Sequence, residues 1–65
     1  MERSPGTESR DEPLRVVLAD DAVLLREGVR SLLEDEGISV VASVGDGQEL
    51  LRAVARLRPD LAIVD

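Results

Sequence analysis

Three aspartates in this chain are placed where acidic chemistry is expected. Asp20 and Asp21 are adjacent and follow one apolar run, and Asp65 follows another. Carboxylates gathered in one place suit Mg²⁺, which takes one or two of them together with waters and a phosphate oxygen. A carboxylate held beside such an ion can also attack phosphorus and form an aspartyl phosphate. The residues therefore predict an ion site, a phosphoryl acceptor or both.

The positions of the aspartates suggest different roles. Asp65 is a single carboxylate at the tip of an expected strand, so we expect it to be the nucleophile. Asp20 and Asp21 are adjacent on an expected turn, which suits ion binding. In a competing interpretation, Asp21 is only the N-cap of a helix, Asp20 a turn residue and Asp65 an ordinary strand end. Spacing alone leaves both interpretations open.

The apolar pattern predicts the order strand, helix, strand, helix, strand. Short apolar runs at residues 14–19, 38–44 and 61–64 predict strands, and the first of them has the length expected for a strand covered on both faces. A helical period begins at Ala22 and stops before Gly37, a residue type that commonly ends helices. The apolar positions expected on one face of this helix are Leu25, Val29, Leu32 and Leu33.

Two further features bear on the helices. Gly28 lies inside the first helix, either as a tolerated weak point or to allow close packing on the sheet. Asp46 and Glu49 form an Asp version of the capping box, which predicts a second helix through about Leu57, closed by Pro59. The apolar face expected for this second helix contains Leu50, Leu51, Val54 and Leu57.

Helix-length crossovers favour parallel strands and an α/β fold. Ligands of such sheets bind beyond the carboxyl ends of the strands, where the strand order reverses. If the third strand returns beside the first, about 5 Å away, the carboxylates of Asp20, Asp21 and Asp65 converge on one pocket. The pattern alone does not establish that return.

Composition narrows the functions further. The chain has 65 residues, no aromatic residue, no Cys and no His, and a net charge of −6. The negative charge argues against direct binding to nucleic acid or anionic membranes, and any metal must be a hard cation held by oxygen. Residues 1–12 mix charges with Ser, Pro and Gly, which predicts a disordered leader rather than a signal peptide or membrane anchor. We expect a cytoplasmic protein.

The residues resemble the receiver domain of two-component response regulators. LRVVLADD matches that family's first strand and acidic pair, and RPDLAIVD matches its third strand and acceptor aspartate. LLREGVRSLLEDEG and VGDGQELL lie between them at the family's usual separations. The resemblance covers about residues 14–65.

The resemblance implies a flavodoxin-like fold, a doubly wound parallel sheet in the order 2-1-3-4-5 that the first strands of this chain would begin. It implies that Asp65 accepts the phosphoryl group, that Asp21 binds Mg²⁺ directly, and that Asp20 assists directly or through water. The implied donor is a phosphohistidine of a sensor histidine kinase, with a second receiver as a dimer partner. The chain would be a phosphoryl acceptor and not an enzyme.

The resemblance also implies that residues 13–65 are the N-terminal half of a receiver domain, truncated after the third strand. The family's phosphoryl-binding Ser or Thr and its Lys cannot be mapped, so we expect weak or no phosphorylation of this polypeptide alone. LLREGVRSLL is most similar to regulators with a helix-turn-helix output domain. Contact with DNA and control of transcription would then belong to that absent domain.

Two other functions are compatible with this order of strands and helices. Nucleotide-binding α/β proteins need a glycine-rich turn after the first strand, whereas the turn here, at residues 19–22, is acidic and lacks glycine. A truncated or degenerate receiver would act only as a protein-interaction module. The presence of Asp20, Asp21 and Asp65 argues against loss of the site.

Overall fold

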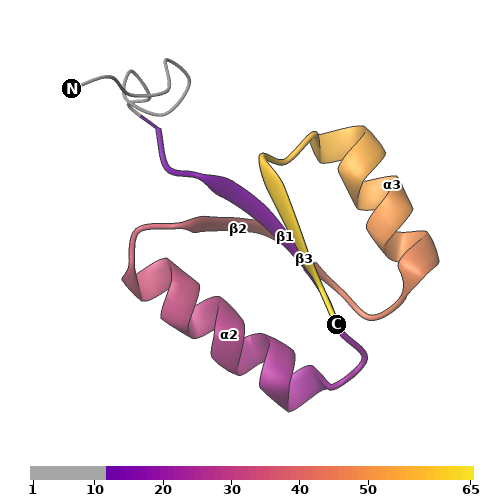
Figure 1. Ribbon diagram of the computed structural model, residues 1–65, viewed down its shortest axis with the longest axis horizontal. Coiled ribbons are helices and arrows are strands. Elements are labelled where there is room, and N and C mark those ends of the chain that lie inside the picture. Colours follow the sequence, from indigo (N-terminus) through magenta and orange to yellow (C-terminus); the bar gives the residue numbers. More distant parts are fainter. Residues whose placement is uncertain (1–11) are drawn as a thin grey trace.

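The computed structural model describes residues 12–65, which form three strands and two helices (Figure 1). The expected disordered leader lies outside the described residues, Glu12 apart. The order of elements expected from the apolar pattern is confirmed. The elements are β1 (Arg15–Ala19), α2 (Val23–Asp35), β2 (Ser39–Val44), α3 (Gly47–Leu57) and β3 (Leu61–Val64).

The sheet is parallel, with the strand order β2-β1-β3. The chain therefore returns past β1 after α3, as the resemblance implied and as the apolar pattern alone could not decide. With right-handed crossovers this order places the two helices on opposite faces, and Figure 1 shows α2 and α3 on the two sides of the sheet. The C-terminal end of the chain lies beside the end of β1. This is the start of a doubly wound, flavodoxin-like sheet.

The core is built around β1, the central strand. On the α2 side, Val16, Leu18 and Val40 form a buried cluster against which Val29, Leu33 and Ile38 pack. The remaining buried residues are Val17, Ala19 and, in α3, Ala53. A continuous apolar run suits this strand because both of its faces are covered.

The pairing of β1 with β2 contains one irregularity. Val16 pairs with Val40, but Val17 pairs with Ala42, so Val41 is an extra residue between two ladder positions. Such a bulge interrupts the alternation of side chains along a strand. Val40 accordingly packs in the α2-side cluster, whereas Ala42 lines a cavity with residues of α3.

Both helices end in left-handed backbone. Gly37 has φ of 82°, and the N–H of Ile38 donates to the carbonyl of Leu33, which closes the last turn of α2. Gly37 is thus the helix stop that the sequence predicts. Helix α3 ends at Leu57, and its C-cap Arg58 adopts φ of 49° although it carries a side chain.

The inner stripe of α2 differs from the one expected. Leu25 and Leu32 are 58% and 68% exposed, and the half-buried positions on the sheet side include Arg26, Val29 and Leu33. Leu25 instead lines an open apolar cavity toward β3, because α2 packs mainly over β2 and leaves the face beside β3 uncovered.

Gly28 also faces away from the sheet. It is exposed, and a Cβ built on it would meet no atom within 4 Å. Close packing is therefore the wrong interpretation of this glycine, and the tolerated weak point is the correct one. No helix within residues 12–65 is long and apolar enough to cross a membrane.

Candidate functional site

The structure brings the predicted site residues to one edge of the sheet. Asp20 follows β1, and its N–H donates to the carbonyl of Val44 at 3.1 Å. Asp65 follows β3, and its N–H donates to the carbonyl of Ala19 at 3.1 Å. These two bonds extend the sheet ladder by one residue on each side of β1, so the positions of both aspartates are set by backbone pairing.

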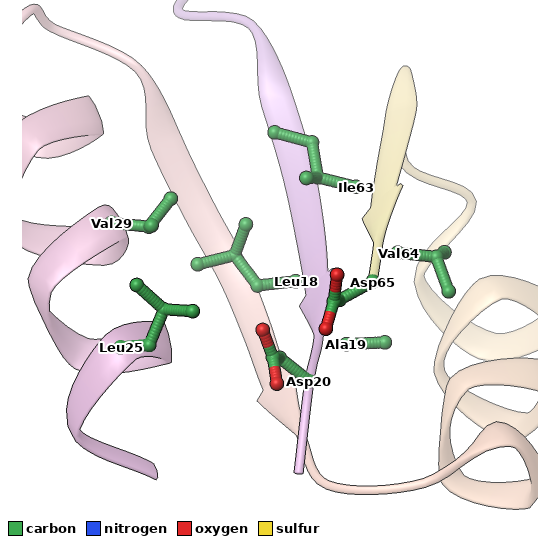
Figure 2. Close-up of a pocket in the computed structure, with 8 residues that line it drawn as sticks. All are labelled: Leu18, Ala19, Asp20, Leu25, Val29, Ile63, Val64 and Asp65. Carbon is green, nitrogen blue, oxygen red and sulfur yellow. The ribbon is translucent and has the colours of Figure 1, made fainter. Parts of the chain in front are cut away.

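The carboxyl ends of the three strands border one open cavity of about 440 Å³, here called the acidic cavity. Its acidic lining residues are Asp20, Asp21, Asp46 and Asp65. Figure 2 shows the carboxylates of Asp20 and Asp65 close to each other at the ends of the adjacent strands β1 and β3. An apolar cavity of about 220 Å³ adjoins this edge and is also lined by Asp20 and Asp65. All three predicted aspartates therefore share one cavity.

The turn after β1 distinguishes the roles of its two aspartates. Oδ1 of Asp20 accepts the N–H of Ala22 at 2.9 Å, which is the bond of an Asx turn. Asp21 is exposed, and the N-cap of α2 is Ala22, which makes no side-chain cap bond. The alternative in which Asp21 caps the helix is therefore wrong, whereas Asp20 is indeed a turn residue. Asp21 has no capping role that would compete with binding an ion.

The carboxylates line the same cavity without forming a compact metal cage. Within residues 12–65, no group of three or more acidic, His or Cys side chains is arranged to hold a metal ion. Mg²⁺ does not need such a cage, because it is commonly bound by one or two carboxylates and retains several waters. The oxygen donors of Asp20, Asp21 and Asp65 fit a hydrated hard cation in an open cavity, and they do not fit a fully dehydrated structural metal.

Asp46 is a site residue that sequence analysis identified only as a cap. Its Oδ1 accepts the N–H of Glu49 at 2.8 Å, as the capping box predicts. The reciprocal bond differs, because Oε1 of Glu49 accepts the N–H of Gly45 at 3.1 Å rather than that of Asp46. Asp46 follows β2, so the rule that places ligands beyond strand ends could have identified it.

Arg26 is a second residue that sequence analysis missed. Its Nη1 donates to the carbonyl of Asp20 at 2.6 Å and to that of Val44 at 3.0 Å. The positively charged guanidinium of Arg26 therefore contacts the backbone of the acidic turn. Its position on the inner stripe of α2, three residues before Val29, was the available signal, because an arginine there must point toward the sheet.

The chain matches a family model over most of its length. Residues 16–65 match the response regulator receiver domain. The matched segment begins in β1, includes both helices and ends at Asp65. It therefore contains every element that borders the acidic cavity.

Relatives with different biological roles share this segment. The transcriptional regulatory protein PdtaR of Mycobacterium tuberculosis is 40% identical over 53 residues, which are 82% of this chain and 26% of PdtaR. The nitrate/nitrite response regulator protein NarP of Escherichia coli is 44% identical over 54 residues, 82% of this chain and 25% of NarP. A protein-glutamate methylesterase/protein-glutamine glutaminase of Paramagnetospirillum magneticum is 46% identical over 63 residues, 95% of this chain and 16% of the relative.

The chain thus spans about a quarter or less of the length of these relatives. No solved structure gave a significant match. The family match over residues 16–65, the parallel order β2-β1-β3 and the aspartates at the strand ends all agree with one another. The chain belongs to the family of response regulator receiver domains.

Proposed function

We propose that Asp65 accepts a phosphoryl group and that Asp20, Asp21 and Asp65 bind the Mg²⁺ required for the transfer. The observation that carries the proposal is the bond from the N–H of Asp65 to the carbonyl of Ala19. This bond fixes Asp65 beside the end of β1, next to Asp20 and on the shared acidic cavity. Membership of the receiver family supplies the expectation of phosphoryl transfer.

The transfer is a substitution at phosphorus. A carboxylate oxygen of Asp65 forms a bond to phosphorus while the bond from phosphorus to a ring nitrogen of the phosphohistidine donor breaks. The histidine leaves as a neutral imidazole, which keeps the proton carried by its other ring nitrogen. The product is a mixed anhydride of the aspartate. Mg²⁺, when bound, would offset the negative charge on the transferred group. Asp20 and Asp21 would hold that ion together with Asp65, and the Asx turn fixes one oxygen of Asp20.

The proposed partners are those of the family. The donor is a phosphohistidine of a sensor histidine kinase, and a second receiver is a dimer partner. PdtaR and NarP are named as regulators, whereas the methylesterase is an enzyme, so output varies among the relatives. We favour a DNA-binding transcriptional regulator as the longer protein in which this receiver works. Residues 13–65 would then be the first half of its receiver domain, and the chain itself would not be an enzyme.

A chimera tests the acceptor role. Residues 14–65 would precede the part of NarP that follows its matched segment, so that the receiver is complete. Incubation with a small acyl phosphate and Mg²⁺ should add one phosphoryl group, detected by intact-protein mass spectrometry. The 65-residue chain alone should gain little or none, because it contains no lysine to stabilise charge on the transferred group.

Matched substitutions complete the design. Asp65→Asn keeps the shape of the side chain but removes the nucleophile, so the chimera should no longer gain the phosphoryl mass. Asp35→Asn makes the same charge change in the last turn of α2 and should leave phosphorylation intact. Full phosphorylation of the Asp65→Asn chimera would refute the proposal. A chimera that folds but never gains the phosphoryl group would favour the interaction-module alternative.

A further inference from the structure

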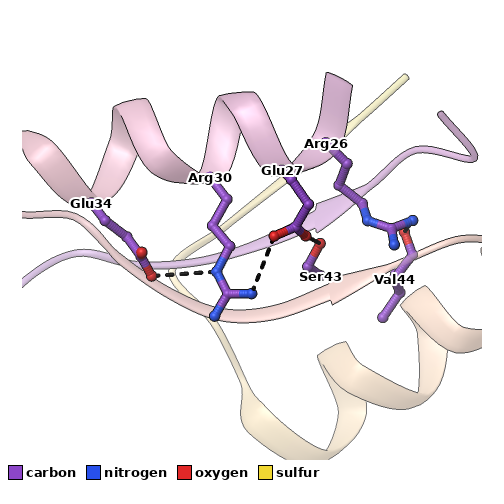
Figure 3. A network of polar contacts seen from close by, with 6 residues as sticks. All are labelled: Arg26, Glu27, Arg30, Glu34, Ser43 and Val44. Carbon is purple, nitrogen blue, oxygen red and sulfur yellow. Dashed lines mark hydrogen bonds and ion pairs between the residues drawn. The ribbon is translucent and has the colours of Figure 1, made fainter. Parts of the chain in front are cut away.

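The guanidinium of Arg26 bridges the ends of two strands. Its Nη1 donates to the carbonyl of Asp20, which follows β1, and to that of Val44, the last residue of β2. Figure 3 shows Arg26 reaching from α2 to Val44, apart from the surface ion pairs of Glu27, Arg30 and Glu34. Hydrogen bonds from a charged donor are stronger than neutral ones. One side chain therefore ties helix α2 to both strand ends.

Arg26 is not explained by packing alone. An aliphatic side chain here would continue the apolar stripe of Val29 and Leu33. The Nε of Arg26 is instead buried with no hydrogen-bond partner within residues 12–65, which opposes folding because a buried donor has lost its water. The gain from arginine at this position therefore lies in its two carbonyl contacts.

Gly45 shows how closely the guanidinium approaches β2. A Cβ at Gly45 would lie 3.4 Å from Nη1 of Arg26, which is van der Waals contact. Gly45 also lines the acidic cavity, so the guanidinium lies next to a residue that borders this cavity.

These contacts hold Asp20 at three points. Its N–H donates to Val44, its carbonyl accepts from Arg26, and its Oδ1 accepts from Ala22. We infer that Arg26 is a positioning residue, which fixes the Asp20 turn against β2 so that the carboxylate is held at the acidic cavity beside Asp65. The importance of Arg26 for phosphoryl acceptance rests on the function proposed above. Its role in positioning Asp20 is independent of that function.

Amide hydrogen exchange, measured by NMR on the 65-residue chain, tests the positioning directly. Arg26→Met keeps the bulk of the side chain but removes its donors, and Arg26→Lys restores the charge with a single donor group. Arg30→Met is the matched control one turn further along α2, where the arginine forms exposed ion pairs. The amide of Leu18, a buried residue within β1, reports general opening of the sheet.

The expected result is a local effect. Arg26→Met should speed exchange at the Asp20 amide at least about tenfold more than at Leu18, the scale of lost charge-assisted hydrogen bonds. Arg26→Lys should recover part of this protection, and Arg30→Met should leave the ratio unchanged. Equal acceleration at Asp20 and Leu18 would mean that Arg26 only stabilises the fold, and it would overturn the inference. If Arg26→Met does not fold, Arg26→Lys decides, since an Asp20 to Leu18 exchange ratio equal to wild type would overturn the inference.

A Mg²⁺ titration of the same variants separates positioning from charge. Removing a positive charge beside a cation site favours cation binding on electrostatic grounds. A less well positioned Asp20 carboxylate should instead weaken Mg²⁺ binding. We therefore expect the dissociation constant for Mg²⁺ to be about threefold or more higher in Arg26→Met than in the unaltered chain, and a lower value would overturn the inference. No response of the unaltered chain to Mg²⁺ would count against the proposed function. In that case the role of Arg26 would be decided by amide exchange at Asp20 without the titration.

Discussion

Replacement of Gly28 by alanine is expected to stabilise the chain by about 1 kcal/mol. Gly28 is exposed in the interior of α2, and a Cβ there would meet no atom within 4 Å. Alanine is favoured over glycine inside a helix by about 0.8–1.0 kcal/mol, and no clash reduces this gain. For a small domain, 1 kcal/mol corresponds to a rise of about 4–8 °C in the midpoint of thermal unfolding.

The assay must follow the backbone, because the chain has no Phe, Tyr or Trp to provide a fluorescence signal. Urea unfolding followed by far-ultraviolet circular dichroism reports the helices directly. With a slope near 1 kcal/mol per molar urea, the midpoint should move upward by about 1 M. The slope itself should not change, since the surface exposed on unfolding is almost the same.

Gly37→Ala provides the matched control. The chemical change is the same and so is the effect on the unfolded chain, but Gly37 has φ of 82°. A side chain in this conformation costs about 1–2 kcal/mol, so Gly37→Ala should lower the urea midpoint. If Gly28→Ala were neutral or destabilising, or if both variants moved the midpoint in one direction, the assignment of Gly28 as an open helical position would be refuted.

Three further variants test the ends of the helices and the site. Asp46→Ala should lower the free energy of unfolding by about 1 kcal/mol because the bond to the N–H of Glu49 is lost, and an unchanged urea midpoint would show that this cap contributes nothing. Arg58→Gly should raise the free energy of unfolding by about 0.5–1 kcal/mol because the left-handed backbone at φ of 49° suits glycine. A lower urea midpoint would contradict this expectation. Asp20→Ala removes both the turn bond to Ala22 and a carboxylate, so Mg²⁺-dependent NMR shifts around the acidic cavity should disappear, and their persistence would exclude Asp20 as a ligand.

The elements of this fold could be predicted from local signals. Gly37 and Pro59 mark helix ends by backbone conformation, and Asp46 begins α3 through its own side chain. Each of these effects depends on a few neighbouring residues. The expected boundaries therefore agree with the observed ones to within about one residue.

The arrangement of the site depends on contacts between distant parts of the chain, which local signals do not contain. The return of β3 beside β1 was implied only by resemblance to a family. Leu25 and Leu32 share the apolar period of α2, but they are exposed because the helix covers β2 rather than β3. Arg26 was missed for a related reason, since its value lies in carbonyls of β1 and β2 that meet only after folding.

The extra residue Val41 has a consequence for how β2 tolerates substitution. Before it, Val40 points toward α2, whereas after it Ala42 lies against α3 and Ser43 reaches Glu27 on α2. The alternation of side chains along β2 therefore shifts by one residue at Val41. Substitutions at Val40 should disturb packing against α2, whereas substitutions at Ala42 and Val44 should disturb packing against α3. A strictly alternating design pattern for this strand would place half of its side chains against the wrong helix.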